Sequence, residues 1–110
     1  MIRATINRTK SGSIQSFTIS GHAGFAAHGS DIVCAGVSAV SFGAVNSIIS
    51  LTGITPDIDQ GADGFLRCDF PDNLPEETQE KVQLLLEGMV VSLQTMERDY
   101  GKHIKITFKQ

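Results

Sequence analysis

The segment from Ile32 to Pro56 contains no charged side chain, and no other feature of the sequence constrains the fold as strongly. A segment of this length and composition must be kept from water, either in a membrane or inside the protein. Asn46 and several serines and glycines interrupt its apolar residues, a pattern that favours a helix buried in protein. We expect this helix to run from about Asp31 to about Leu51 and to be covered by other elements on more than one side.

Two glycines, Gly36 and Gly43, lie inside this predicted helix. Each costs roughly 1 kcal/mol of helix stability relative to alanine. A cost of that size in a buried helix indicates that another element packs closely against these positions.

The rest of the chain divides into strand and helix patterns. Alternating apolar and polar residues predict five strands, over residues 1–8, 14–20, 56–59, 65–70 and 103–108. Apolar residues at helical spacing predict a second, amphipathic helix over 76–100. The order ββαββαβ predicts an α+β fold, a single domain over 1–110 with two helices on one face of a mostly antiparallel sheet. In the last strand, we expect Ile106 and Phe108 to point inward and His103 to lie on the polar surface.

Charge and cysteine content exclude several classes of protein. The chain has 110 residues, a formal net charge of -3 and a pI near 5.5, whereas nucleic-acid-binding domains usually carry a basic stripe. We therefore expect no direct nucleic-acid binding. The first residues show no signal-peptide pattern. Because the interrupted apolar run favours a helix buried in protein, we expect no membrane association either. Cys34 and Cys68 do not make a disulfide framework, which favours the cytoplasm, and Cys68 falls on the apolar face of a strand as a core side chain.

The residues from Gly21 to Ala39 hold the polar groups best suited to chemistry. Ser30 or Asp31 is a natural N-cap for the uncharged helix, which places Cys34 in its first turn. Unpaired backbone N–H groups and the positive end of the helix dipole both favour a thiolate there. Cys34 is therefore a candidate nucleophile, although a cysteine in a buried helix is more often inert packing.

A nucleophilic thiolate needs a general base and donors for the developing oxyanion. His22 lies within loop reach of Cys34 and is the candidate base, and the first turn of the helix is expected to supply the donors. Asp31 could cap the helix, orient the imidazole, or do both. Ser38 lies one turn further along the same face, where we expect its hydroxyl to bond a backbone carbonyl of its own helix.

A loop of small residues connects His22 to the helix. Its glycines let the loop move and let another backbone approach. Candidate substrate-binding residues in this loop are Ala23, Gly24, Gly29 and Ser30. We expect His28, in the same loop, to be exposed and without a role.

Other readings of the same residues are open. His22, His28, Asp31 and Cys34 include the ligand types of a zinc site, but no known finger spacing matches, so we expect no metal and no cofactor. A phosphate-binding loop is disfavoured because the Lys-Ser/Thr ending is missing. A non-enzymatic module that clamps a peptide with this loop is the main alternative to an enzyme.

Two motifs follow the second predicted strand: Gly21-His22-Ala23, then Gly29-x-Asp31-Ile32-Val33-Cys34-Ala35-Gly36-x-Ser38-Ala39. Together they resemble the signature of the ribosomal-processing cysteine protease Prp family. The likeness continues through 42–52, 56–58 and 91–97, so it spans most of the chain.

The resemblance implies a small cytoplasmic peptidase of Firmicutes-type bacteria. Members of that family remove a short N-terminal extension from the large-subunit ribosomal protein numbered twenty-seven during ribosome maturation, and they are dimeric. By position, His22 matches the catalytic histidine and Cys34 the nucleophile. Gly21, Asp31 and Ser38 match motif positions tied to activity or to the shape of the site. The implied partners are thus a ribosomal protein precursor as substrate and a second copy of the chain.

Overall fold

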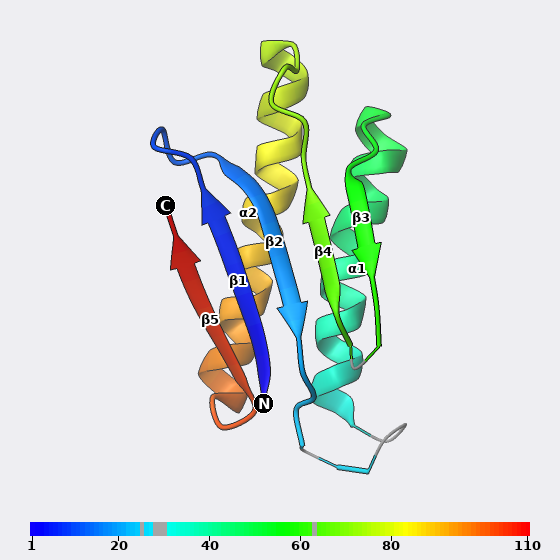
Figure 1. Cartoon of the computed structure of the whole chain (residues 1–110), viewed down its shortest axis with the longest axis vertical. Helices are drawn as coiled ribbons and strands as arrows, with labels where there is room; N and C mark the ends of the chain where they lie inside the picture. Colours follow the sequence, from blue (N-terminus) through cyan, green and yellow to red (C-terminus); the bar gives the residue numbers. More distant parts are fainter. Residues whose placement is uncertain (25, 28–30, 63) are drawn as a thin grey trace.

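The computed structural model describes residues 1–24, 26–27, 31–62 and 64–110. The elements are β1 (Ile2–Arg8), β2 (Ile14–Ser20), α1 (Ile32–Thr52), β3 (Asp57–Gln60), β4 (Leu66–Asp69), α2 (Glu76–Tyr100) and β5 (Ile104–Lys109) (Figure 1). This order confirms the predicted α+β fold. Gly53 ends α1 in a left-handed conformation, with a φ of 75° and its N–H bonded to the carbonyl of Ile49.

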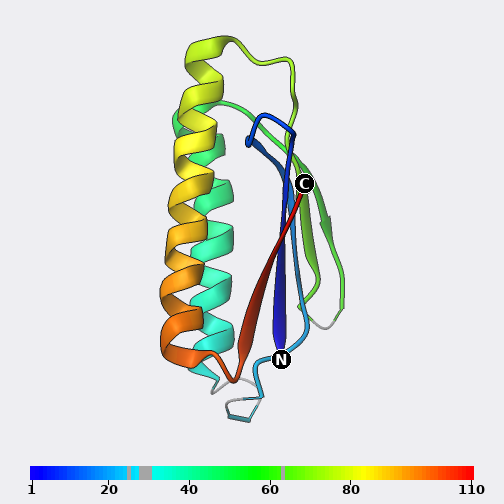
Figure 2. The same cartoon turned by 90° about the vertical axis from the view of Figure 1, so that its left-hand side faces the viewer.

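The five strands form one sheet in the order β3-β4-β2-β1-β5. The pairs β1–β2, β2–β4 and β3–β4 are antiparallel, whereas β1 and β5 are parallel. Both helices lie on the same face of this sheet (Figure 2). The structure thus confirms a mostly antiparallel sheet covered on one side, and it adds the strand order that the sequence left open.

The core lies between the sheet and the helices. Its fully buried side chains include Ile6, Phe17, Ile48, Leu86 and Leu93. Phe108 points toward the helix-facing side, as expected, because it pairs with the fully buried Ile6 of β1. Its ring is nevertheless 45% exposed and lies 5.6 Å from the guanidinium carbon of Arg8. Phe108 is near the end of an edge strand, where the helices no longer cover the sheet.

Helix α1 is covered by the sheet and, alongside, by α2, as expected, but its remaining side is open, so the expectation of a central helix is wrong. Its buried residues form a single stripe that faces the sheet and α2: Val33, Val37, Ser41, Val45 and Ile48. No described element covers the opposite side (Figure 2). By length and composition alone α1 could cross a membrane, a test that core helices of soluble proteins also pass.

The two helix glycines behave differently. A Cβ atom on Gly36 would lie 2.8 Å from Cε of Met96, so the expected close packing against another element is confirmed there. A Cβ atom on Gly43 would meet nothing within 4 Å, so the same expectation is wrong for Gly43. Gly43 lies on the uncovered side of α1, where the chain leaves open space.

Candidate active site

The N-terminus of α1 is capped by Asp31, as predicted. Its Oδ1 accepts the N–H of Val33 at 2.9 Å and the N–H of Cys34 at 3.0 Å, and the residue is 8% exposed. The cap places Cys34 in the first turn. It also occupies two first-turn N–H groups, which are therefore not free to bind an oxyanion while the cap is in place.

The Cys34 thiol is free and half-buried, and a different backbone group points at it. The N–H of Ala23 donates to Sγ over 3.3 Å. Ala23 belongs to the segment that follows β2 and is 3% exposed. The loop that follows β2 is thereby tied to the first turn of α1 through this backbone donor.

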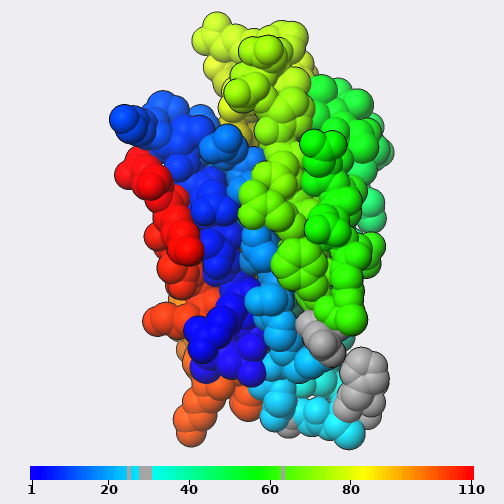
Figure 3. Space-filling view, viewed as in Figure 1, coloured from blue at the N-terminus to red at the C-terminus, as the bar shows by residue number. Residues whose placement is uncertain are grey.

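A sharp corner at Gly21 directs this segment. Gly21 has a φ of 86°, and a Cβ atom there would overlap the carbonyl oxygen of Met1. Only glycine combines this conformation with so close an approach. Beyond the corner the His22 side chain is exposed, whereas Ala23 is buried (the segment is light blue at the base of Figure 3).

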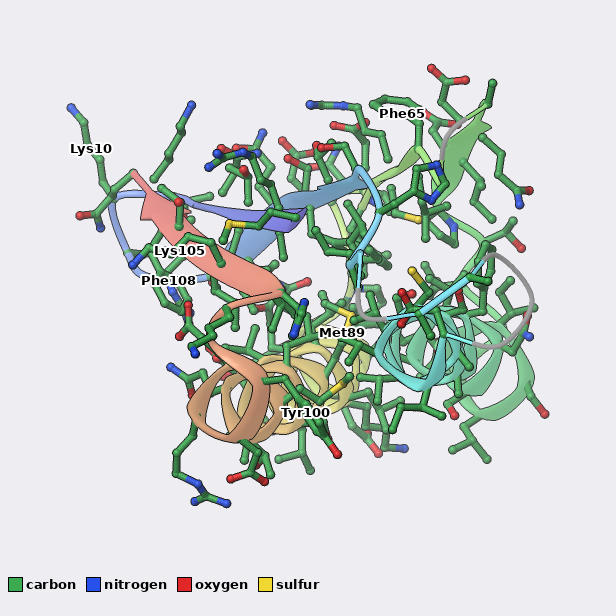
Figure 4. All side chains as sticks on the ribbon, turned by 90° about the horizontal axis from the view of Figure 1, so that it is seen from below. Lys10, Phe65, Met89, Tyr100, Lys105 and Phe108 are labelled. Carbon is green, nitrogen blue, oxygen red and sulfur yellow. The ribbon has the colours of Figure 1, made fainter. Side chains whose placement is uncertain are left out.

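His22 and Cys34 line the same pocket, which has a volume of about 530 Å³. Figure 4 views the molecule from this end, where α1 begins and Tyr100 marks the last turn of α2. Of the residues predicted for the site, six line the pocket: Gly21, His22, Gly24, Asp31, Cys34 and Ser38. Sequence reasoning missed its remaining lining residues: Ile2, Ile19, Ala26, Ala35, Val37 and Gly64.

Ser38 contributes an exposed hydroxyl to the pocket wall. The bond expected from this hydroxyl to a carbonyl of its own helix is absent among the described residues. Ser41 makes such a bond instead, to the carbonyl of Val37 at 2.8 Å. The Ser38 hydroxyl is therefore available to a group bound in the pocket.

His103 has a contact that the sequence did not indicate. We expected it on the polar surface, but it is half-buried and its Nδ1 lies 2.9 Å from the carbonyl oxygen of Ala23. The two residues are 80 positions apart in the chain, so no local pattern could have revealed the contact.

Cys68 is confirmed as a core side chain. It is 0% exposed on the helix-facing side of β4. Burial, and secondarily the charge of Asp69, raises the pKa of its thiol to about 11. Cys68 is therefore a protonated, inert thiol at neutral pH.

Part of the predicted site lies outside the described residues, namely His28, Gly29 and Ser30. Within the described part of the chain, no three His, Cys, Asp or Glu side chains are grouped so that they could hold a metal ion. Among the described residues, the pocket therefore brings together a free thiol at Cys34 and an imidazole at His22, and the Ala23 N–H bonds that thiol.

An α+β domain with a free thiol at a capped helix N-terminus, and a histidine in the same pocket, has the features of a thiol hydrolase. The model of the family Cysteine protease Prp matches residues 1–105. The chain therefore belongs to the Prp family of cysteine proteases, and it is a cysteine protease.

Relatives and solved structures agree with this assignment. The ribosomal processing cysteine protease Prp of Bacillus subtilis (strain 168) is 53% identical over 108 residues, which is 97% of this chain and 96% of the relative. The protein of the same name from Staphylococcus aureus (strain Mu50) is 40% identical over 112 residues, with 99% and 100% covered.

Two crystal structures of the S. aureus protease Prp cover 99% of this chain and 100% of their own. One holds a covalently linked product peptide, with a TM-score of 0.89 and 40% identity. The other holds a substrate peptide, with a TM-score of 0.84 and 37% identity.

Proposed function

We propose that this protein removes the short N-terminal extension of the large-subunit ribosomal protein numbered twenty-seven, in the cytoplasm, during ribosome maturation. Cys34 is the nucleophile and His22 the general base. The observation that carries the proposal is the Cys34 thiol at the capped start of α1, in one pocket with His22. The relatives named for ribosomal processing support the substrate class.

The proposed reaction proceeds through a thioester. His22 takes the proton of Cys34, and the thiolate attacks the carbonyl carbon of the scissile peptide bond. The Ala23 N–H turns from Sγ to the new oxyanion, and protonated His22 gives its proton to the leaving amine. Water, deprotonated by His22, then attacks the thioester and releases the acid product and the free thiol.

The pocket suits an extended peptide with apolar side chains. Ile2, Ile19 and Val37 provide apolar wall, and Ser38 provides one hydroxyl. We propose that the loop residues Ala23, Gly24, Gly29 and Ser30 contact the peptide backbone, as glycine and alanine allow a close approach.

The deciding experiment is incubation of the protein with the unprocessed ribosomal protein, followed by intact mass spectrometry. Wild-type protein should make one cut near the substrate's N-terminus, and Cys34→Ala and His22→Ala should make none. Binding of the substrate without any cut by wild-type protein would instead favour a non-catalytic peptide-binding module in ribosome assembly.

We further propose that the protein acts as a homodimer through the uncovered side of the helices. A groove there is lined by small residues of α1 and by residues of α2: Ala39, Val40, Gly43, Ala44, Ser47, Leu84, Leu85, Gly88, Met89 and Ser92. Leu84, in this groove, is 74% exposed in the single chain. A second copy of the groove would remove Leu84 from water, and the small residues would let the helices approach closely.

A further inference from the structure

The backbone of His103 is held from two sides, between the end of α2 and the start of β5. Its N–H donates to the carbonyl of Tyr100 at 2.8 Å, and its own carbonyl accepts the N–H of Ile2 at 2.9 Å. The Cα–Cβ bond of His103 therefore has a fixed direction relative to α2 and β1. An imidazole carried there can act as a rigid tether.

The imidazole of His103 is hydrogen-bonded to the backbone carbonyl of Ala23. Its Nδ1 lies 2.9 Å from the carbonyl oxygen of Ala23. A carbonyl oxygen can only accept, so Nδ1 carries the hydrogen and donates it. On its other side Ala23 donates its N–H to Sγ of Cys34 at 3.3 Å. Ala23 is thus fixed through its carbonyl by His103, while its N–H contacts the thiol.

The segment around Ala23 has little local preference for this conformation. Gly21 and Gly24 both have positive φ angles, of 86° and 67°, and glycine adopts many other conformations equally well. The Ala23 side chain offers only a methyl group to the core. A tether from another part of the chain is therefore needed to keep the N–H aimed at sulfur.

We infer that His103 is a positioning residue for the catalytic thiol: it holds Ala23 so that the Ala23 N–H stays directed at Cys34. The inference rests on the proposed role of Cys34 as nucleophile. His103 acts through Ala23, first on the Cys34 sulfur and then on the oxyanion. Because His22 is bonded directly to Ala23 along the chain, the same tether limits where the general base can lie.

The test compares variants of His103 in the full-length protein. His103→Phe keeps a ring but removes the donor, and His103→Asn keeps an N–H close to the place of Nδ1. Gln83→Leu is the matched control: its amide bonds the backbone of Ile14 at 2.7 and 2.9 Å. It too ties α2 to the sheet, but at the start of β2, about 20 Å from the site.

The first readout is the rate at which iodoacetamide alkylates Cys34 at about pH 6 without substrate, with the modified cysteine assigned by peptide mass. We expect His103→Phe to lower this rate about fivefold, since a hydrogen bond to a charged group changes an equilibrium by roughly tenfold or more when fully lost. His103→Asn should stay within about twofold of wild type, and Gln83→Leu should match wild type even where its unfolding midpoint is lower.

The second readout is kcat/KM on a peptide that carries the substrate's leader. It should fall in His103→Phe through kcat and be restored in His103→Asn. The inference would be overturned if His103→Phe were alkylated at the wild-type rate. It would also be overturned if kcat/KM fell equally in the Phe and Asn variants. If His103→Phe does not fold, His103→Leu takes its place. Alkylation needs no substrate, so an error in the proposed substrate would leave this readout intact.

Discussion

Arg8 of β1 donates two hydrogen bonds to the carboxylate of Glu87 on α2, at 2.6 and 2.8 Å, across 79 positions of sequence. Two parallel bonds of this kind make a guanidinium–carboxylate pair geometrically specific. The pair raises the pKa of Arg8 and lowers the pKa of Glu87, in both cases chiefly through the hydrogen bond itself.

Removal of this pair should make stability depend less on pH. The folded-state pKa of Glu87 lies below its ordinary value of 4.5, so the stabilisation is present at neutral pH and is lost as pH falls through the folded value. The Glu87 side chain is 44% exposed, which limits the contribution to about 1 kcal/mol. Urea unfolding should show Glu87→Gln less stable than wild type at pH 7 and equal to it near pH 2. If the difference in stability between wild type and Glu87→Gln persisted at acid pH, the ion pair would not be its cause.

The two functions considered for Asp31 can be separated by substitution. Asp31→Ala removes the cap and should cost about 1–2 kcal/mol in the free energy of unfolding, together with most activity. Asp31→Asn keeps an oxygen for the N–H groups of Val33 and Cys34, so its stability should fall by less than about 0.5 kcal/mol. We expect its kcat/KM to stay within about threefold of wild type. A much larger loss of kcat/KM in a stable Asn variant would show that the charge also orients His22.

The corner at Gly21 should be intolerant of any side chain. Gly21→Ala adds a Cβ against the Met1 carbonyl at a positive φ, so thermal unfolding should show a loss of about 2 kcal/mol or more. Gly61→Ala is the control, because its Cβ would make only ordinary contacts with Phe65, 3.6 Å at the nearest. If the two substitutions lowered the stability equally, the conformation of Gly21 would not be the cause of the loss.

The dimer proposal can be tested with two equally exposed leucines. Leu84 lies in the helix groove and is 74% exposed, whereas Leu51 is 71% exposed and lies outside the residues that line the groove. Sedimentation should show wild type and Leu51→Glu as dimers and Leu84→Glu as a monomer, because a buried unpaired carboxylate is strongly unfavourable. If the wild type and both variants sediment as dimers, the interface lies elsewhere.

The two cysteines should differ in reactivity by their place in the fold. Because burial raises the pKa of the Cys68 thiol to about 11, iodoacetamide at pH 8 should modify Cys34 alone in the native protein. In urea both should react, which peptide mass mapping can measure. Modification of native Cys68 at a comparable rate would mean that the β4 face opens to solvent.

The parts of the structure that the sequence predicted are those set by local chemistry. The Asp31 cap, the end of α1 close to the predicted Leu51 and the apolar face of α2 depend on residues a few positions apart. The strand order, the exposure of Phe108 and the His103 contact depend on which distant segments meet, and residue spacing carries no such information. The missing cover of α1 belongs to this second kind, since an apolar helix face does not reveal whether its own chain or another copy packs on it.

The parallel pairing of β1 with β5 affects when this protease first becomes competent. His22 and Cys34 are synthesised early, but β5 follows every other described element, and His103 immediately precedes it. Until that segment has been made, β1 lacks one neighbour and Ala23 lacks its tether. If His103 positions Ala23 as proposed, a nascent chain carries His22 and Cys34 before it carries the residue that aligns them, so the site is completed only after α2 and His103 have been made.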